Sequence, residues 1–429
     1  MSTRWTVTGS WPLALLALLV LSGCDGGGGG EDAEAVVRFD SAGVSIVENH
    51  APAWELDGAD PAWVVAPEPD LAIGVMEGDP DYQFGRVVGM VALPDGRIVV
   101  GDAQARDGKL RLFAPDGTLQ STAAPEGEGP EGIMNLSWLA QVPGDRIGVW
   151  DSNLNRLSIL SAGSGGLEWD ELRSLDLSHP DPPDPPPGTR LMIAISPTPI
   201  GLLADGSLLG MAGGIGGTGF LERYRTERSL FHWGTDGEVL NSLGTIPGGT
   251  GTTPDLSTGS TTAPPTPFPG REVVGLHDDR LYHGADAEGY VIRVLRPDGT
   301  LERLVRRTDV DLAITPELRS LWRDEEIARA EDPDEHRERV AQAIFPEMRA
   351  PFEEMRIDGS GYLWLRDPPV PGAEAPVTWQ VFEPDGRHLG GVAMPDGFSL
   401  RQVGEDFVLG VYTDDFDVPY IHRYRLEGR

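Results

Sequence analysis

The chain has one cysteine, Cys24, and one lysine, Lys109. With a single cysteine no disulfide can form within the chain, so stability must come from secondary structure and its packing. Positive charge is also scarce, since 34 Lys and Arg stand against 68 Asp and Glu and give a formal net charge of −34. A field of this sign repels nucleic acid and anionic lipid headgroups, and we expect no nucleic-acid partner.

Motifs of nucleophilic and metal-dependent catalysis are missing as well. There is no Gly-x-Ser-x-Gly elbow, no HExxH and no EF-hand loop, so we assign no catalytic residue and no metal ligand. Residues 214–219 match the dinucleotide fingerprint, but strand-like aromatic sequence follows them, and we interpret them as a flexible loop. No cofactor is indicated, although the acidic composition leaves room for Ca²⁺ bound by carboxylates.

The N-terminal segment has the features of an export signal. An early charge, Arg4, precedes an apolar stretch at 13–21 that is too short for a comfortable membrane span. It ends in Leu21-Ser22-Gly23-Cys24, which resembles the lipobox of bacterial lipoproteins, where the cysteine is lipidated after cleavage. The resemblance implies a signal peptide at 1–23, a tether at 24–35 and a membrane-anchored lipoprotein on the periplasmic or cell-surface side. The alternative is a secreted protein with a chance cysteine.

The most informative positive feature is a recurring tight turn. In such turns proline presets φ, aspartate bonds its own backbone and glycine accepts a positive φ. The turn occurs six times: Pro94-Asp95-Gly96, Pro115-Asp116-Gly117, Thr235-Asp236-Gly237, Pro297-Asp298-Gly299, Pro384-Asp385-Gly386 and Pro395-Asp396-Gly397.

Short apolar runs flank these turns and define repeating units. The best-preserved unit, Val88–Leu119, predicts four strands and two hairpins in about 35 residues. Five more units follow: Leu136–Leu160, Ile200–Leu243, Glu272–Arg296, Phe352–Val392 and Phe398–Leu426. Sheets of this size cannot bury their faces alone, so we expect six of them to pack around a common axis.

This texture resembles the NHL-like six-bladed β-propellers, and especially the bacterial six-bladed β-propeller lipoproteins. The resemblance implies an all-β, six-bladed β-propeller over residues 36–429. The last unit stops after its third strand, Tyr420–Leu426, so a strand from the N-terminal segment should close the ring and leave no exposed edge. The candidates are a hairpin at Val36–Val47 and a strand at Leu71–Val75.

The long insertions are expected on one face of the ring, opposite the tight turns, and loops of this kind carry function more often than the scaffold. Within the insertion at 309–349, Thr315-Pro316-Glu317 predicts a helix start, and a second helix is expected at Asp334–Ile344. This helical hairpin either lies over the mouth of the ring or is a spacer. The insertions are His179–Arg190, Gly210–Gly219, Thr245–Gly270, Asp309–Arg349 and Asp367–Pro376.

Polar residues recur where the second strand of a unit reaches the decorated face. Asp102, Asp151 and Arg366 occupy the same step, and Asp286 lies one residue beyond it. The aspartates either bond loop amides and hold the blades together or, with Arg366, bind a polar ligand such as a sugar or peptide. We expect a monomeric, non-catalytic binding or scaffolding module for an envelope protein or glycan. The alternative is a propeller hydrolase or lyase acting on a sugar, lactone or peptide with a divalent cation at the mouth.

Overall fold

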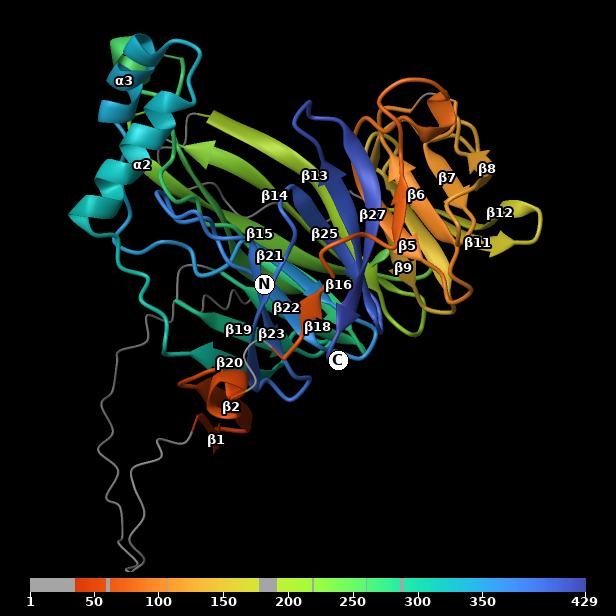
Figure 1. The fold of residues 1–429 in the computed structure, drawn as a ribbon, viewed down its shortest axis with the longest axis horizontal. Helices are drawn as coiled ribbons and strands as arrows, with labels where there is room; N and C mark the ends of the chain where they lie inside the picture. Colours follow the sequence, from red (N-terminus) through yellow and green to blue (C-terminus); the bar gives the residue numbers. More distant parts are fainter. Residues whose placement is uncertain are drawn as a thin grey trace, which may run out of the picture. The chain divides into compact units, whose positions relative to one another are not determined.

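The described strands form six β-sheets, each built around consecutive antiparallel strands. Figure 1 shows how the strands are arranged. The computed structural model describes residues 35–58, 62–105, 107–176, 191–217, 220–259, 261–285 and 289–429. All these residues belong to one compact unit, Ala35–Arg429. Within them no helix is both long and apolar enough to cross a membrane.

Each sheet is one blade, and its strands follow one another from the first to the fourth. Blade 1 has β5 (Val87–Ala92), β6 (Ile98–Asp102), β7 (Leu110–Phe113) and β8 (Leu119–Ala123). Blade 2 has β9 (Leu136–Val142), β10 (Arg146–Asp151), β11 (Arg156–Gly163) and β12 (Gly166–Ser174). Blade 3 has β13 (Leu191–Leu202), β14 (Leu208–Gly217), β15 (Arg223–Trp233) and β16 (Val239–Thr252).

The second half of the ring is built in the same way. Blade 4 has β17 (Val273–His277), β18 (Arg280–Gly284), β19 (Val291–Leu295) and β20 (Leu301–Arg307). Blade 5 has β21 (Glu354–Ile357), β22 (Leu363–Arg366), β23 (Thr378–Phe382) and β24 (His388–Ala393). Blade 6 has β25 (Phe398–Val403), β26 (Phe407–Thr413) and β27 (Pro419–Glu427). Two short 3-10 helices, η1 (Pro80–Tyr82) and η2 (Leu256–Thr258), lie in connections.

The first strands of the blades form a closed ring. Strands β5, β9, β13, β17, β21 and β25 each contact the next, and β25 contacts β5. The described residues also form six buried apolar clusters, and each cluster joins two neighbouring blades. This follows from strand alternation, since Val99 packs toward blade 2 while Val100, the next residue, packs toward blade 6. The predicted all-β, six-bladed β-propeller is therefore confirmed.

The tight turns have the predicted local chemistry. Asp95 Oδ1 accepts a hydrogen bond from Arg97 N at 3.1 Å, and Gly96 has a φ of 85°. Five of the six turns join the first strand to the second or the third to the fourth, and so lie on one face. The sixth, at 395–397, instead connects β24 to β25 and lies on the opposite face.

The N-terminal strap, residues 36–73, runs along the outer strands of three blades. Strands β1 (Val36–Ser41) and β2 (Val44–Asn49) extend blade 4, where β2 pairs in parallel with β20. The short helix α1 (Ala53–Leu56) contacts β24 of blade 5. Strands β3 (Val64–Val65) and β4 (Leu71–Ile73) then pair with β27 and complete blade 6. Ring closure by an N-terminal strand is confirmed, whereas the place of the hairpin in blade 4 was not anticipated.

Two of the expected loops are partly strand. The prediction of a loop at 210–219 is wrong for 210–217, because β14 continues to Gly217 and pairs with β13. Glycine also lets β14 approach β15 closely, since a Cβ at Gly213 would lie 2.7 Å from the carbonyl oxygen of Glu227 in β15. Residues 245–252 likewise belong to β16. The expected insertion at 179–190 lies outside the described residues.

The predicted helical hairpin is confirmed as α2 (Pro316–Ala328) and α3 (Pro333–Ala341). The Thr315 hydroxyl caps α2 by accepting from Leu318 N at 3.2 Å, and Asp332 caps α3. Figure 1 shows the two helices near the far ends of the long strands of blade 3. The hairpin contacts two further insertions, so it is not an isolated spacer.

Candidate functional site

Asp102 and Asp151, two of the predicted site residues, are buried at the ends of β6 and β10. The Asp102 carboxylate accepts hydrogen bonds from the backbone N–H groups of Gly85, Arg86 and Gln104 at 3.0, 2.9 and 3.0 Å. The Asp151 carboxylate accepts from those of Met134, Asn135, Asn153 and Leu154 at 2.7, 3.2, 3.0 and 3.2 Å. Both carboxylates thus hold loops of their own blade, and a ligand-binding role for them stays a prediction.

Arg366 lies at the end of β22 and bonds within blade 5. Its Nη1 is 2.8 Å from Glu354 Oε1 and 3.4 Å from Glu353 Oε2. Burial raises the pKa of Glu353, against the opposing charge of Arg366. The partners of Asp102 lie in blade 1, those of Asp151 in blade 2 and those of Arg366 in blade 5. The structure therefore does not bring these three residues together in one network. Asp286 lies outside the described residues.

Among the residues that the structure describes, no group of three or more His, Cys, Asp or Glu is arranged to hold a metal ion. Calcium at the mouth of the ring therefore remains a prediction from composition.

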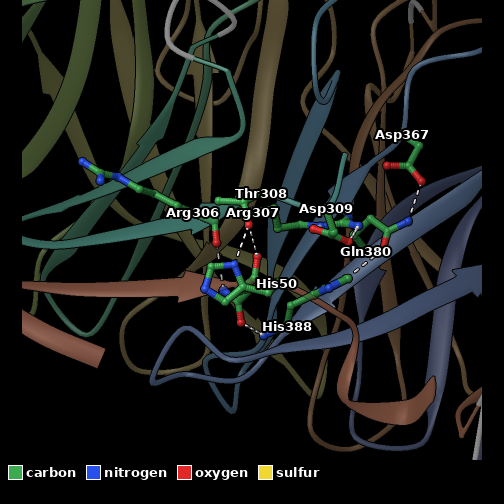
Figure 2. A network of polar contacts seen from close by, with 9 residues as sticks. His50, Arg306, Arg307, Thr308, Asp309, Asp367, Gln380 and His388 are labelled. Carbon is green, nitrogen blue, oxygen red and sulfur yellow. Dashed lines mark hydrogen bonds and ion pairs between the residues drawn. The ribbon is translucent and has the colours of Figure 1, made fainter. Parts of the chain in front are cut away.

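A different set of polar side chains crosses the contact between blades 4 and 5 (Figure 2). Gln380 Nε2 donates to Asp367 Oδ2 at 2.6 Å, and His388 Nε2 lies 2.9 Å from Gln380 Oε1. Because the amide oxygen of Gln380 can only accept, His388 carries its proton on Nε2. The His388 side chain is buried, and its ring centroid lies 4.8 Å from that of Phe382.

An ion pair from blade 4, with side chains 9% and 17% exposed, lies beside this network. Arg307, the last residue of β20, donates from Nε to Asp309 Oδ1 at 3.0 Å and from Nη2 to Asp309 Oδ2 at 2.6 Å. Its guanidinium also lies over the ring of Tyr290, 5.0 Å from the centroid. A bidentate pair with an aromatic face beneath it has a strongly determined orientation.

The N-terminal strap completes the network through Asn49. Its Nδ2 donates to the carbonyl oxygens of Arg306 and Gly386 at 3.0 and 3.1 Å, and its Oδ1 accepts from His388 N at 2.8 Å. One fully buried side-chain amide thus joins blade 4 to blade 5. The next residue, His50, is exposed, and its Nδ1 lies 2.7 Å from Thr308 Oγ1.

Burial and local charge set the protonation states here. Burial, with the charge of Arg307, lowers the pKa of His388 to about 3, so the imidazole is neutral at pH 7. Burial also raises the pKa of Asp367. Burial also disfavours the charged forms of Arg307 and Asp309. The hydrogen bonds and opposite charges of the pair outweigh this effect, so the pKa of Arg307 is raised and the pKa of Asp309 is lowered. Such a cluster of shifted pKa values is typical of functional sites, although structural networks also produce it.

An open cleft of about 470 Å³, the Arg307 cleft, lies against this network. Its lining includes positive and negative side chains, the amide of Gln380 and the backbone of two glycines. Such a lining suits a polar ligand that both donates and accepts hydrogen bonds. None of the described residues that line it is a cysteine or a serine. The lining residues are His50, Ala51, Pro52, Glu55, Arg307, Asp309, Gln380, Gly390 and Gly391.

Sequence reasoning missed this site, although one signal was available. Asp309 and Asp367 are the first residues of two of the long insertions, so both lie on the decorated face. The aligned position in the sequence was that of Arg366, one residue before Asp367, and successive residues of an extended chain point to opposite faces. Arg366 bonds Glu354, whereas Asp367 bonds Gln380 on the side of blade 4.

Comparisons with known proteins give a likeness of structure and none of sequence. No family model and no curated protein matches the chain. A candidate exported protein from Bacteroides fragilis NCTC 9343 is similar at 10% identity and a TM-score of 0.44, covering 89% of this chain and 98% of that one. A candidate gluconolactonase is similar at 16% identity and a TM-score of 0.40, covering 88% and 97%.

A catalytically inactive virginiamycin B lyase from Staphylococcus aureus, solved with quinupristin, is similar at 11% identity and a TM-score of 0.38, covering 85% and 99%. Likeness at this level says nothing about activity. The class of the protein therefore rests on its own architecture, a six-bladed β-propeller with a polar cleft between blades 4 and 5.

Proposed function

We propose that this chain is a lipid-anchored, extracytoplasmic β-propeller that binds an envelope glycan or protein without catalysis. The binding surface is the decorated face near blades 4 and 5. Three insertions meet there, and we call them the cap: residues 261–272, 308–353 and 367–377. One residue of the cap, Asp309, also lines the Arg307 cleft.

The observation that carries the proposal is that two cap segments pack together at Phe345 and that a hydrogen bond joins the third segment to them. Trp322 of α2 meets Phe345 edge-on at 5.2 Å between ring centroids, and Phe268 of another insertion lies at 6.3 Å. Hydrogen bonds join the same parts, from Arg339 Nη2 to Ala263 O at 3.2 Å and from Gly372 N to Glu325 Oε1 at 2.5 Å. If these segments were only spacers, such contacts between them would not be expected.

The groups with shifted pKa values support binding rather than proton transfer. The His388 side chain is fully buried, and its Nε2 is engaged by Gln380. A general acid or base must reach the proton that it transfers. The exposed charged or titratable residues that line the cleft are instead His50, Glu55 and Asp309, and the Asp309 carboxylate is paired with Arg307.

Removal of the helical hairpin is expected to weaken partner binding and leave the ring folded. Ile314 N donates to Glu347 O at 3.2 Å, so residues 315–346 can be replaced by Asn-Gly without separating the chain ends. Mature protein with and without the hairpin would be used to recover partners from envelope extract and to screen a glycan array. We expect about tenfold lower recovery, since binding energy concentrates in a few central residues.

The matched control for this deletion changes the opposite face. Asp116→Asn with Asp298→Asn removes two exposed charges from third-to-fourth-strand turns. It should recover the same partners as the wild type. If the deletion variant also recovers them all, while its circular dichroism is native, the proposed role of the cap is wrong.

Membrane anchoring depends on one atom, the Cys24 sulfur, which lies outside the described residues. Cys24→Ala is expected to leave the precursor uncleaved and unlipidated, because no other thiol in the chain can accept a diacylglycerol. Mass spectrometry of the membrane fraction measures both changes. Gly28→Ala in the tether should be processed like the wild type, and a cleaved, lipid-free Cys24→Ala product would contradict the anchor.

A further inference from the structure

A second cleft lies on the other face of the blade 4 sheet. Arg306 and Arg307 are consecutive in β20, so their side chains leave the strand on opposite sides. Figure 2 shows the Arg306 side chain extended away from the network that contains Arg307. The second cleft, which we call the Arg306 cleft, has a volume of about 640 Å³. It is lined by Arg293, Arg306 and residues at both ends of the 309–349 insertion, and Arg307 touches its edge as well.

The Arg306 guanidinium is the unpaired charge of this cleft, because no described residue forms an ion pair with it. Glu48 is its neighbour in the parallel register of β2 and β20, yet the Glu48 carboxylate lies 3.7 Å from His50 Nε2 instead. The other acid in the lining, Asp311, uses Oδ1 to accept from Ala313 N at 2.9 Å. A guanidinium has five N–H donors and no other protonation state at physiological pH, so it calls for an anion.

Apolar side chains make up a large part of the lining beside these charged groups. The bridge between Ala313 and Met348 closes the insertion over the sheet, and Met348 is 49% exposed. Methionine adapts its shape to different ligands because its side chain is unbranched and flexible. The apolar side chains of the cleft are Val291, Leu304, Val310, Leu312, Ala313 and Met348.

We propose that the Arg306 cleft binds a small organic carboxylate with an apolar body. The carboxylate accepts from the Arg306 guanidinium, and the apolar body packs against Leu304, Val310 and Met348. A single negative charge suits the site better than a phosphate dianion, because the carboxylates of Glu48 and Asp311 are close by. This ligand is distinct from the polar partner proposed for the Arg307 cleft.

The test uses the compact unit, residues 35–429, with 2-naphthoate and its uncharged isostere 2-naphthamide as probes. Isothermal titration should give one naphthoate site per chain, with weaker binding of the amide. Arg306→Gln should weaken naphthoate binding at least about tenfold and leave naphthamide binding unchanged, as expected for loss of a charge-assisted hydrogen bond. The Arg306 carbonyl that Asn49 uses remains in this variant, so its unfolding temperature should match that of the wild type.

Arg303→Gln is the matched control, because Arg303 lies on the same strand and bonds Pro384 O on the side of blade 5. It should bind naphthoate like the wild type. Equal naphthoate affinity in wild type and Arg306→Gln, equal affinity for acid and amide, or no saturable binding would each overturn the proposal. None of these results depends on the partner recovered through the cap, so the two proposals can fail separately.

Discussion

Asn49→Ala is expected to lower the free energy of unfolding by about 3 kcal/mol, because it leaves buried backbone groups without partners. The amide of Asn49 serves the carbonyl oxygens of Arg306 and Gly386 and the N–H of His388. Alanine serves none of them, and a fully buried position admits little water in compensation. The three groups belong to two blades, so the loss falls on the contact between blades.

Urea unfolding followed by tryptophan fluorescence measures this change. Asn241→Ala is the control, because Asn241 is an exposed residue of β16, and its effect should stay within about 0.5 kcal/mol. Asn49→Asp should also destabilise, since it places carboxylate oxygens opposite two carbonyl oxygens. An unchanged unfolding midpoint for Asn49→Ala would show that the amide does not hold blades 4 and 5 together.

Asp358→Ala is expected to cost about 3–5 kcal/mol of unfolding free energy, the usual loss when one partner of a buried ion pair is removed. Asp358 lies in the first turn of blade 5 and is 3% exposed. Its carboxylate accepts from Ser360 N, Tyr362 N and Trp364 Nε1 at 2.9, 3.1 and 3.2 Å, and it pairs with Arg429 Nη2 at 2.8 Å.

Arg429 extends this network to the closure of the ring. Its guanidinium lies 5.1 Å from the ring centroid of Trp63, in the N-terminal strap, and its Nη1 donates to Gly404 O of blade 6 at 2.7 Å. Loss of Asp358 therefore leaves a buried cation at the place where strap, blade 5 and blade 6 meet. We expect Asp358→Ala and Arg429→Ala to be strongly non-additive, because each removes the same interaction.

The control for Asp358 is the exposed ion pair between Arg38 of the strap and Asp385 of blade 5, 2.6 Å apart. Asp385 is 56% exposed, so Asp385→Asn should cost no more than about 1 kcal/mol. Chemical denaturation of the single and double variants provides the measurement. A cost for Asp358→Ala no greater than that for Asp385→Asn would contradict its role in ring closure.

Much of the fold could be predicted because its determinants are local. The turn at 94–96 needs only proline, aspartate and glycine in order, and the start of α2 needs only Thr315 and Pro316. Alternating apolar residues then define the strands between such signals. The loop predicted at 210–219 is wrong for 210–217, because glycine-rich sequence fits both a loop and a closely packed strand. Only the neighbouring strands decide between the two.

The candidate site could not be predicted, because its members are far apart in the chain. Asn49 and His388 are separated by 339 positions and meet only because the strap extends blade 4 beside blade 5. Neither residue has an unusual local sequence. Asp102 and Asp151 share one position in the repeat, so the sequence alone singles them out, but their carboxylates bond loop amides. The Arg307 cleft is instead formed by a fourth strand, the strap and the next blade.

By itself the sequence determined the repeat, the number of blades and the face that carries the insertions, since short-range periodicity and turn chemistry suffice for these. Tertiary structure alone decided that the N-terminal hairpin adds to blade 4 and that two insertions pack against each other at Phe345. It also decided that Arg306 lines one cleft while the Arg307 side chain pairs with Asp309 at another. The physical reason is that burial and charge at these places come from segments brought together only when the ring closes.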